Sequence, residues 1–208
     1  MKISVHRLEG FSDALIAIII TLMVLELKLP STFTYLEVIE LVKSIGIFFI
    51  SFIIVGYQWD RHQRMFDGLT NVSNQVVWRN LLFLFFLSLI PLFTKWMIQH
   101  PSAILPALGY DIVYLLIECS VRALFVSIIN ESKDTNKMNE FKRLKEERSN
   151  RGELSNRRFV LFFIMLVLVI LFSIYIPTIS IILFLILPVA TSLANIFQRE
   201  RRGHNKKR

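Results

Sequence analysis

The stretch Arg7–Pro30, RLEGFSDALIAIIITLMVLELKLP, decides the fold class of this chain. Its middle, Ala14–Leu25, carries no charge. A helix from about Gly10 to Leu29 would supply the roughly 20 mostly apolar residues that cross a membrane, and Pro30 would end it. The short apolar core after basic residues is also typical of signal peptides, but no small-residue cleavage site follows. We therefore expect a retained first transmembrane helix.

Further apolar blocks follow, and 54% of all residues are apolar while 19% are charged. The longest block, Phe159–Gln198, is 40 residues without a charge, which is about 60 Å of helix and roughly twice the hydrocarbon thickness. It must fold back, and Tyr175–Thr178 contains the proline that marks the turn. We predict an all-α polytopic protein with a single six-helix domain, whose helices cover about residues 10–29, 36–57, 78–97, 107–129, 159–176 and 178–198.

Basic residues alternate between the connections in a way that predicts the orientation. The segment 130–158 contains nine Lys and Arg residues and the tail 199–208 contains six, whereas the opposite side has only Lys28, Lys43 and Lys95. Basic loops stay in the cytoplasm, so we expect both termini, the 130–158 loop and the tail there, in a plasma membrane. The net charge of +8 then indicates topology and contact with anionic lipid rather than nucleic acid.

Charged and polar residues inside the predicted spans need partners. A carboxylate in a membrane is expensive unless it is paired, so we expect Asp13 to bond to another helix. Glu118 and Arg122 are four residues apart in the fourth span and can neutralise each other; Asp111 in the same span has no assigned partner. In the first span, Ile18, Leu22 and Leu25 share a helical stripe with Thr21 beside them, and such stripes usually pack against neighbouring helices, with a Thr hydroxyl bonded to the carbonyl four residues back.

No catalytic motif is present in the sequence. It has no P-loop, no Gly-rich dinucleotide turn and no metal-ligand spacing among its four His residues and its single Cys119. We therefore predict a protein that is not an enzyme and that has no cofactor or resident metal. Transport or a structural role is favoured.

Three motifs resemble one known family. Arg7 lies four residues before Phe11-Ser12-Asp13, the second span ends in Trp59-x-x-His62, and the third begins with Trp78-x-Asn80. Their order and placement over about the first 95 residues are similar to the FSD-motif potassium channels, the bacterial and archaeal relatives of the endosomal and lysosomal potassium channel. The remainder of the chain is matched mainly by its number of spans.

The resemblance implies a homotetramer of six-helix subunits in which the first helices line a central pore, with potassium as the transient permeant. It implies that Ile18, Leu22 and Leu25 form aliphatic constrictions and that Thr21 contributes to potassium selectivity. The chain also lacks the Thr-Val-Gly-Tyr-Gly loop of carbonyl filters. A bracing network is implied at the cytoplasmic end, from the residues Arg7, Phe11, Ser12, Asp13, Trp59, His62 and Asn80. Two alternatives stay open, a proton-permeable or weakly selective cation channel on the same fold, and a non-conducting membrane scaffold.

Overall fold

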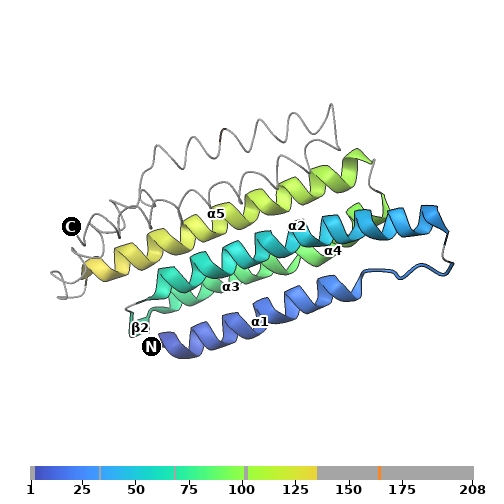
Figure 1. The fold of residues 1–208 in the computed structure, drawn as a ribbon. Coiled ribbons are helices and arrows are strands. Elements are labelled where there is room, and N and C mark those ends of the chain that lie inside the picture. The colour runs from blue at the N-terminus through green and yellow to red at the C-terminus, as the bar shows by residue number, and fades with distance from the viewer. Residues whose placement is uncertain (1–2, 33, 68, 101–102, 135–163, 165–208) are drawn as a thin grey trace, which may run out of the picture.

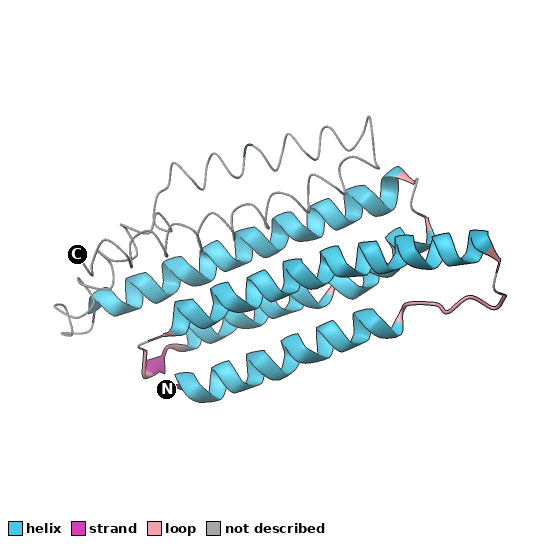
Figure 2. Ribbon diagram, in the orientation of Figure 1, coloured by secondary structure: helices cyan, strands magenta, loops and turns pink. Residues whose placement is uncertain are grey.

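The protein folds into a bundle of long helices (Figures 1 and 2). The structure is a computed structural model that describes residues 3–32, 34–67, 69–100, 103–134 and 164. Within these ranges the prediction of an all-α membrane protein is confirmed, because four helical segments are long and apolar enough to cross a membrane. The expected helices 159–176 and 178–198, the tail and most of the 130–158 loop lie outside the described residues.

The four spans are made of five helices. Helix α1 is Val5–Leu25, α2 is Tyr35–Phe66, α3 is Asn74–Ser88, α4 is Ile90–Gln99 and α5 is Ile104–Asp134. Helices α3 and α4 form one span, interrupted at Leu89, which is the carboxyl cap of α3. Proline explains the interruption: Pro91 has no N–H to donate, and its ring would clash with the carbonyl of Leu87 in a continuous helix.

The observed helices differ in their bounds from the apolar windows expected from hydropathy, and most are longer. Helix α1 begins at Val5 and ends at Leu25 rather than covering about 10–29, and α2 continues nine residues past Tyr57 to Phe66. Helix α5 runs on to Asp134, so the first residues of the expected 130–158 loop are helical. The polar end of α2 stays helical because Gln58, Arg61 and His62 bond to other helices, which a hydropathy window cannot detect.

A short pair of strands fastens the amino terminus to the connection between α2 and α3. Strand β1, Ile3–Ser4, pairs antiparallel with β2, Asn71–Val72, and the Val5 N–H donates to the carbonyl of Thr70 at 3.1 Å. The apolar side chains of this region are buried with the start of α1. The pairing therefore fixes where α1 enters the bundle.

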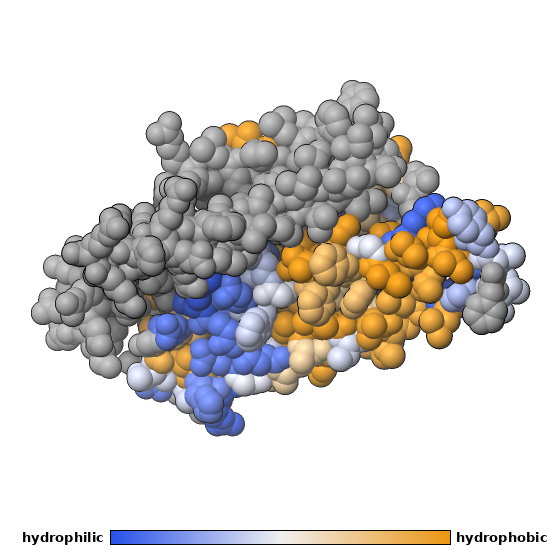
Figure 3. All heavy atoms as spheres, viewed as in Figure 1, coloured by the Kyte–Doolittle hydropathy of each residue, from blue (hydrophilic) through white to orange (hydrophobic). Residues whose placement is uncertain are grey.

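The core lies between all five helices, and α2 contributes Ile54, Val55, Met65 and Phe66 to it. Helix α1 contacts α2, α3 and α4, and α5 packs against α3 and α4. Figure 1 accordingly shows α1 and α5 on opposite sides of the bundle with the other helices between them. The inner face of α1 is apolar, since Ile16, Ile19 and Met23 are all at most 3% exposed. Figure 3 shows hydrophilic residues gathered at the end that holds the amino terminus and a hydrophobic band beyond them.

We predict that Gly109 on α5 is required for close packing against α4. A Cβ at this position would overlap the Phe93 ring and lie 2.8 Å from its Cδ1, closer than side chains tolerate, and forced overpacking costs about 1–3 kcal/mol. The Gly109→Ala variant should therefore melt at a lower temperature in detergent. Gly46→Ala is the matched control, because a Cβ there meets nothing within 4 Å and alanine favours the helix. Equal losses in both variants would contradict this packing account.

Candidate pore-lining face and its bracing network

The aliphatic residues singled out on α1 lie together on its outward face. Ile18 is 52% exposed, Leu22 48% and Leu25 77%, whereas the adjacent Ile19 is 3% exposed and packs into the bundle. Residues three, four and seven apart share a helix face, so these three side chains form a continuous apolar stripe. In this single chain, one side of α1 packs against its own bundle and the other side presents large apolar groups.

The hydroxyl of Thr21 lies on the same exposed face. It donates to the carbonyl of Ile18 at 2.8 Å. The acceptor is three residues back, so the expected bond to Ala17, four residues back, is wrong. Because the proton is used inside the helix, the oxygen lone pairs remain available as acceptors on the exposed side.

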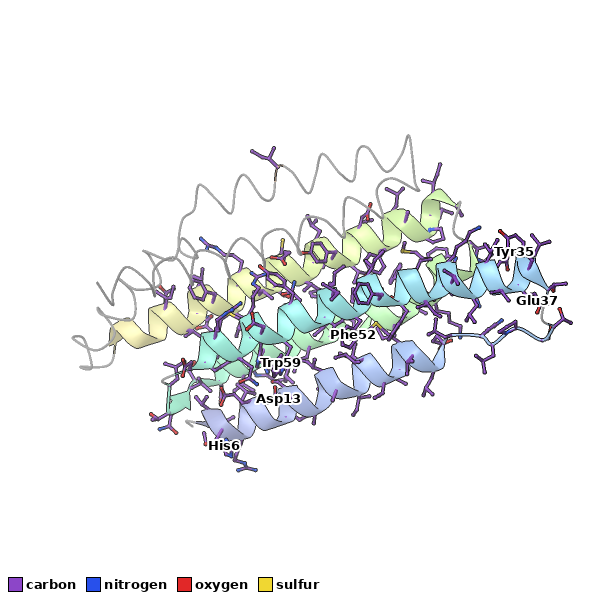
Figure 4. The ribbon with its side chains drawn as sticks, viewed as in Figure 1. His6, Asp13, Tyr35, Glu37, Phe52 and Trp59 are labelled. Carbon is purple, nitrogen blue, oxygen red and sulfur yellow. The ribbon has the colours of Figure 1, made fainter. Side chains whose placement is uncertain are left out.

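The carboxylate of Asp13 is held by α2. Its Oδ1 accepts hydrogen bonds from Trp59 Nε1 at 2.9 Å and from Gln63 Nε2 at 2.7 Å, and Figure 4 shows Asp13 and Trp59 facing each other across these two helices. Bonds to a charged acceptor are about twice as strong as neutral ones. Gln63 was missed by the sequence interpretation, although it lies one residue beyond His62 on the same turn.

A second branch begins at the neighbouring Ser12, which is fully buried. Its hydroxyl donates to the Leu8 carbonyl at 2.8 Å and accepts from Asn80 Nδ2 at 2.9 Å, while Asn80 Oδ1 lies 2.7 Å from His62 Nε2. Because the Ser12 hydroxyl donates to the Leu8 carbonyl, the Asn80 amide group donates to Ser12. The Asn80 oxygen then accepts a hydrogen bond from His62, which assigns the imidazole proton to Nε2. His62 also stacks on Phe83, with the ring planes 14° apart.

The expected bracing residues therefore divide into separate groups. Asp13 bonds with Trp59, whereas His62 bonds with Asn80 and not with Asp13. Arg7 is exposed, and within the described ranges no hydrogen bond or ion pair joins it to the others. Phe11 is 48% exposed. It lies seven residues before Ile18, and therefore on the same side of α1 as the aliphatic stripe.

Glu118 on α5 has a partner that the sequence interpretation did not assign to it. Its carboxylate accepts from Arg61 Nη1 at 2.7 and 2.8 Å and from Gln58 Nε2 at 2.7 Å. The Arg61 guanidinium also lies over the Tyr57 ring, 5.4 Å from its centroid. Local helical spacing could not reveal Arg61 as a partner of Glu118, because the two residues are 57 positions apart in the chain.

Two further polar contacts join the spans nearer the other end of α1. The buried Ser51 hydroxyl accepts from Thr94 at 2.8 Å and from Tyr110 at 3.0 Å, which connects α2, α4 and α5. Glu26, the carboxyl cap of α1, forms an ion pair with Lys95 on α4, with Oε2 and Nζ 2.9 Å apart. No cluster of metal-ligating residues occurs in the part of the chain that the structure describes.

These features define a class: a multi-pass α-helical membrane protein whose first helix is braced by polar bonds at one end and has an exposed apolar stripe along its length. Residues 7–91 match the family described as "Endosomal/lysosomal potassium channel TMEM175". The part of the chain that carries the three motifs is thus similar to the TMEM175 family, which is a family of ion channels.

Similar proteins include a potassium channel of Chryseobacterium sp. (strain P1-3), which is 38% identical over an alignment that covers 54% of this chain and 65% of that protein. The mouse endosomal/lysosomal proton channel TMEM175 is 29% identical over 59% of this chain and 26% of its own length. This chain thus spans less than two thirds of the curated relatives that it matches.

A solved structure resembles the fold over most of the chain. It is a lysosomal potassium-selective channel TMEM175 homolog from Chamaesiphon minutus, with a TM-score of 0.66, 22% sequence identity and coverage of 92% of this chain and 97% of that one. At this identity the likeness supports the fold.

We predict that Asp13 stabilises the bundle through its two bonds to α2. Asp13→Ala removes two hydrogen bonds to a charged group, each worth about 1.5–3 kcal/mol, and should lower the melting temperature in detergent clearly. Asp13→Asn keeps an acceptor oxygen and should fall between that variant and the parent. The control is Asp67→Ala, at an exposed position that caps α2. If Asp13→Ala and Asp67→Ala melt alike, the Asp13 bonds do not hold α1.

Proposed function

We propose that this chain is the subunit of a potassium-permeable channel that conducts passively through a central pore lined by α1. The observation that carries the proposal is the stripe of Ile18, Leu22 and Leu25, each about half exposed or more, on a helix whose opposite face is buried. Relatives named potassium channels, and the family description itself, support the choice of ion.

The proposed mechanism depends on a ring of Ile18 side chains. Several copies around one axis would place their aliphatic groups together near the middle of the membrane. Such a constriction offers no ligands, so an entering ion loses hydration without replacement, and a narrow apolar ring also tends to dewet. Leakage would be low, and divalent cations would be excluded more strongly than potassium.

The subunits assemble as a homotetramer in this proposal. One α1 helix cannot enclose a pore, and the sequence contains one six-helix unit per chain, so the aliphatic stripe of each copy must meet those of others. The remaining parts of the proposal are the two helices at about 159–176 and 178–198, both termini in the cytoplasm, and a plasma membrane with anionic lipid beside the basic loop and tail.

The bracing network would hold α1 in the rotation that a pore requires. Asp13 and Ser12 each bond to a different partner helix, so they resist rotation of α1 about its own axis. We assign this positioning role to Ser12, Asp13, Trp59, His62 and Asn80, and add Gln63.

A proton-permeable channel on the same architecture is the second candidate. It is favoured by the mouse relative, which is named a proton channel. The two candidates differ in what sets the reversal potential of the current.

The deciding experiment is a planar-bilayer recording of the purified protein, with potassium, sodium and pH gradients applied one at a time. Potassium permeation predicts a reversal potential that follows the potassium gradient, whereas proton permeation predicts one that follows pH. Native mass spectrometry of the same sample should give a tetramer. A stable conducting monomer or dimer would contradict the assembly, and a protein that carries no current would be a scaffold.

We predict that Ile18 controls conduction. Ile18→Ala shortens the side chain, and Ile18→Asn offers the ion a ligand. Either change should lower the energy barrier to ion passage; a reduction of about 1 kcal/mol would raise the single-channel conductance roughly fivefold. Discrimination among cations should become weaker. Ile19→Ala is the matched control, because Ile19 is 3% exposed and packs inside the bundle; it should lower yield and stability instead. If Ile19 variants alter permeation while Ile18 variants conduct like the parent, the pore face is wrong.

We predict that Thr21 contributes to cation choice. Its oxygen faces outward with its proton bonded to Ile18, so it can act as an acceptor for a partly dehydrated cation. Thr21→Ala should bring the potassium-to-sodium permeability ratio closer to one, while Thr21→Ser, which keeps the oxygen, should preserve it. The measurement is the reversal potential under biionic conditions. An unchanged permeability ratio in Thr21→Ala would contradict a role of the hydroxyl in cation selectivity.

A further inference from the structure

The ion pair at the carboxyl end of α1 lies where the proposed pore would open away from the bracing network. Glu26 immediately follows the last residue of α1, and Lys95 reaches it from α4. Their side chains are 35% and 43% exposed, respectively. Both charged groups are therefore partly exposed in the subunit, and Glu26 directly follows Leu25, the last member of the aliphatic stripe.

Glu26 occupies a place where a negative charge is unfavourable for the helix itself. The carboxyl end of a helix carries a partial negative charge from its unpaired carbonyl groups. A carboxylate at this cap adds to that potential, and the Lys95 ammonium, 2.9 Å away, opposes it. The contact thus decides whether the end of each α1 is electrically negative or nearly neutral.

Among the bases at this end of the described chain, Lys95 is the one that forms an ion pair with Glu26. The sequence places three acids and three bases in the described segments around it, Glu26, Glu37, Glu40, Lys28, Lys43 and Lys95. Glu37 is engaged by the α1–α2 connection, where it accepts from the Thr32 backbone N–H at 2.7 Å and from the Ser31 hydroxyl at 3.4 Å. Figure 4 shows Glu37 at the far end of α2, opposite the end that holds His6.

We propose that Lys95 limits the cation conductance of this pore mouth by neutralising Glu26. The inference rests on the proposed function, since it requires α1 to line the pore. Repeated around an axis, unpaired Glu26 carboxylates would form a ring of negative charge that raises the local cation concentration. In the native protein, each Glu26 carboxylate is paired with one Lys95 ammonium group, so the ring carries little net charge.

The ion pair between Glu26 and Lys95 contributes little to the stability of the fold. Ion pairs between partly exposed side chains typically contribute little to stability, whereas α1 is also held by its buried apolar face and by Ser12 and Asp13. Removal of Lys95 should therefore leave the assembly folded. The consequence to look for is electrostatic, and an electrostatic consequence must be screened by salt.

The test compares the current per channel of the parent and its variants in bilayers of uncharged phosphatidylcholine. Recordings are made at about 0.02 M and about 1 M potassium chloride, because the Debye length falls from about 20–30 Å to about 3 Å between them. We expect Lys95→Gln to raise the conductance about twofold or more at low salt and to match the parent at high salt. Glu26→Gln, which leaves the ammonium unpaired, should lower it at low salt.

The double variant Lys95→Gln/Glu26→Gln and the control Lys43→Gln complete the design. The double variant should conduct like the parent at both salt concentrations, because the local charge is again balanced. Lys43 is an exposed lysine on α2 that has no ion-pair partner in the described chain, so its removal should have a smaller effect.

Three results would overturn the inference while the channel still conducts. They are a Lys95→Gln effect that persists at high salt, one that survives in the double variant, and one that Lys43→Gln reproduces in full. A parent protein that carries no current would overturn the proposed function together with this inference.

Discussion

The rotation of α1 about its own axis is the constraint on which the rest of this structure depends, and two adjacent polar residues set it. Ser12 bonds toward Asn80 on α3, and Asp13 bonds toward Trp59 and Gln63 on α2. The hydrocarbon region of a membrane offers no water as a hydrogen-bond partner, so these polar side chains must form hydrogen bonds with other helices. Because they hold one end of α1 in place, the aliphatic stripe is directed away from the bundle along its whole length.

Helix α2 acts as the common support through a single polar stretch near its carboxyl end. On one side of this stretch, Trp59, His62 and Gln63 bond to α1 and α3. On the other, Gln58 and Arg61 bond to the buried carboxylate of Glu118 on α5. Helix α2 therefore links α5 to α1 through hydrogen bonds, although α5 and α1 are not bonded to each other by these side chains. Leaving one partner of such a buried pair without the other is far more destabilising than losing an exposed pair, which makes this end the rigid one.

The opposite end of α1 is held by weaker means. The hydroxyl cluster of Ser51, Thr94 and Tyr110 joins the other spans to one another but does not include α1. There α1 has its apolar packing and the partly exposed pair of Glu26 and Lys95. The bundle thus combines a firmly bonded end, which fixes the geometry of the first helix, with an end where exposed charges can be matched or unmatched at small energetic consequence.

The sequence alone determined the features that depend on composition and local spacing. Long apolar blocks predicted a membrane protein, because only helices or closed barrels satisfy the backbone in lipid, and the 3.6-residue period placed Ile18, Leu22 and Leu25 on one face. The order of the motifs indicated the family that residues 7–91 match. Tertiary structure alone decided which polar groups meet. It paired Glu118 with Arg61, His62 with Asn80, Asp13 with Gln63, and Glu26 with Lys95. Each of these contacts joins residues far apart in the chain, and their meeting depends on how helices rotate and align when they pack, which no local pattern encodes.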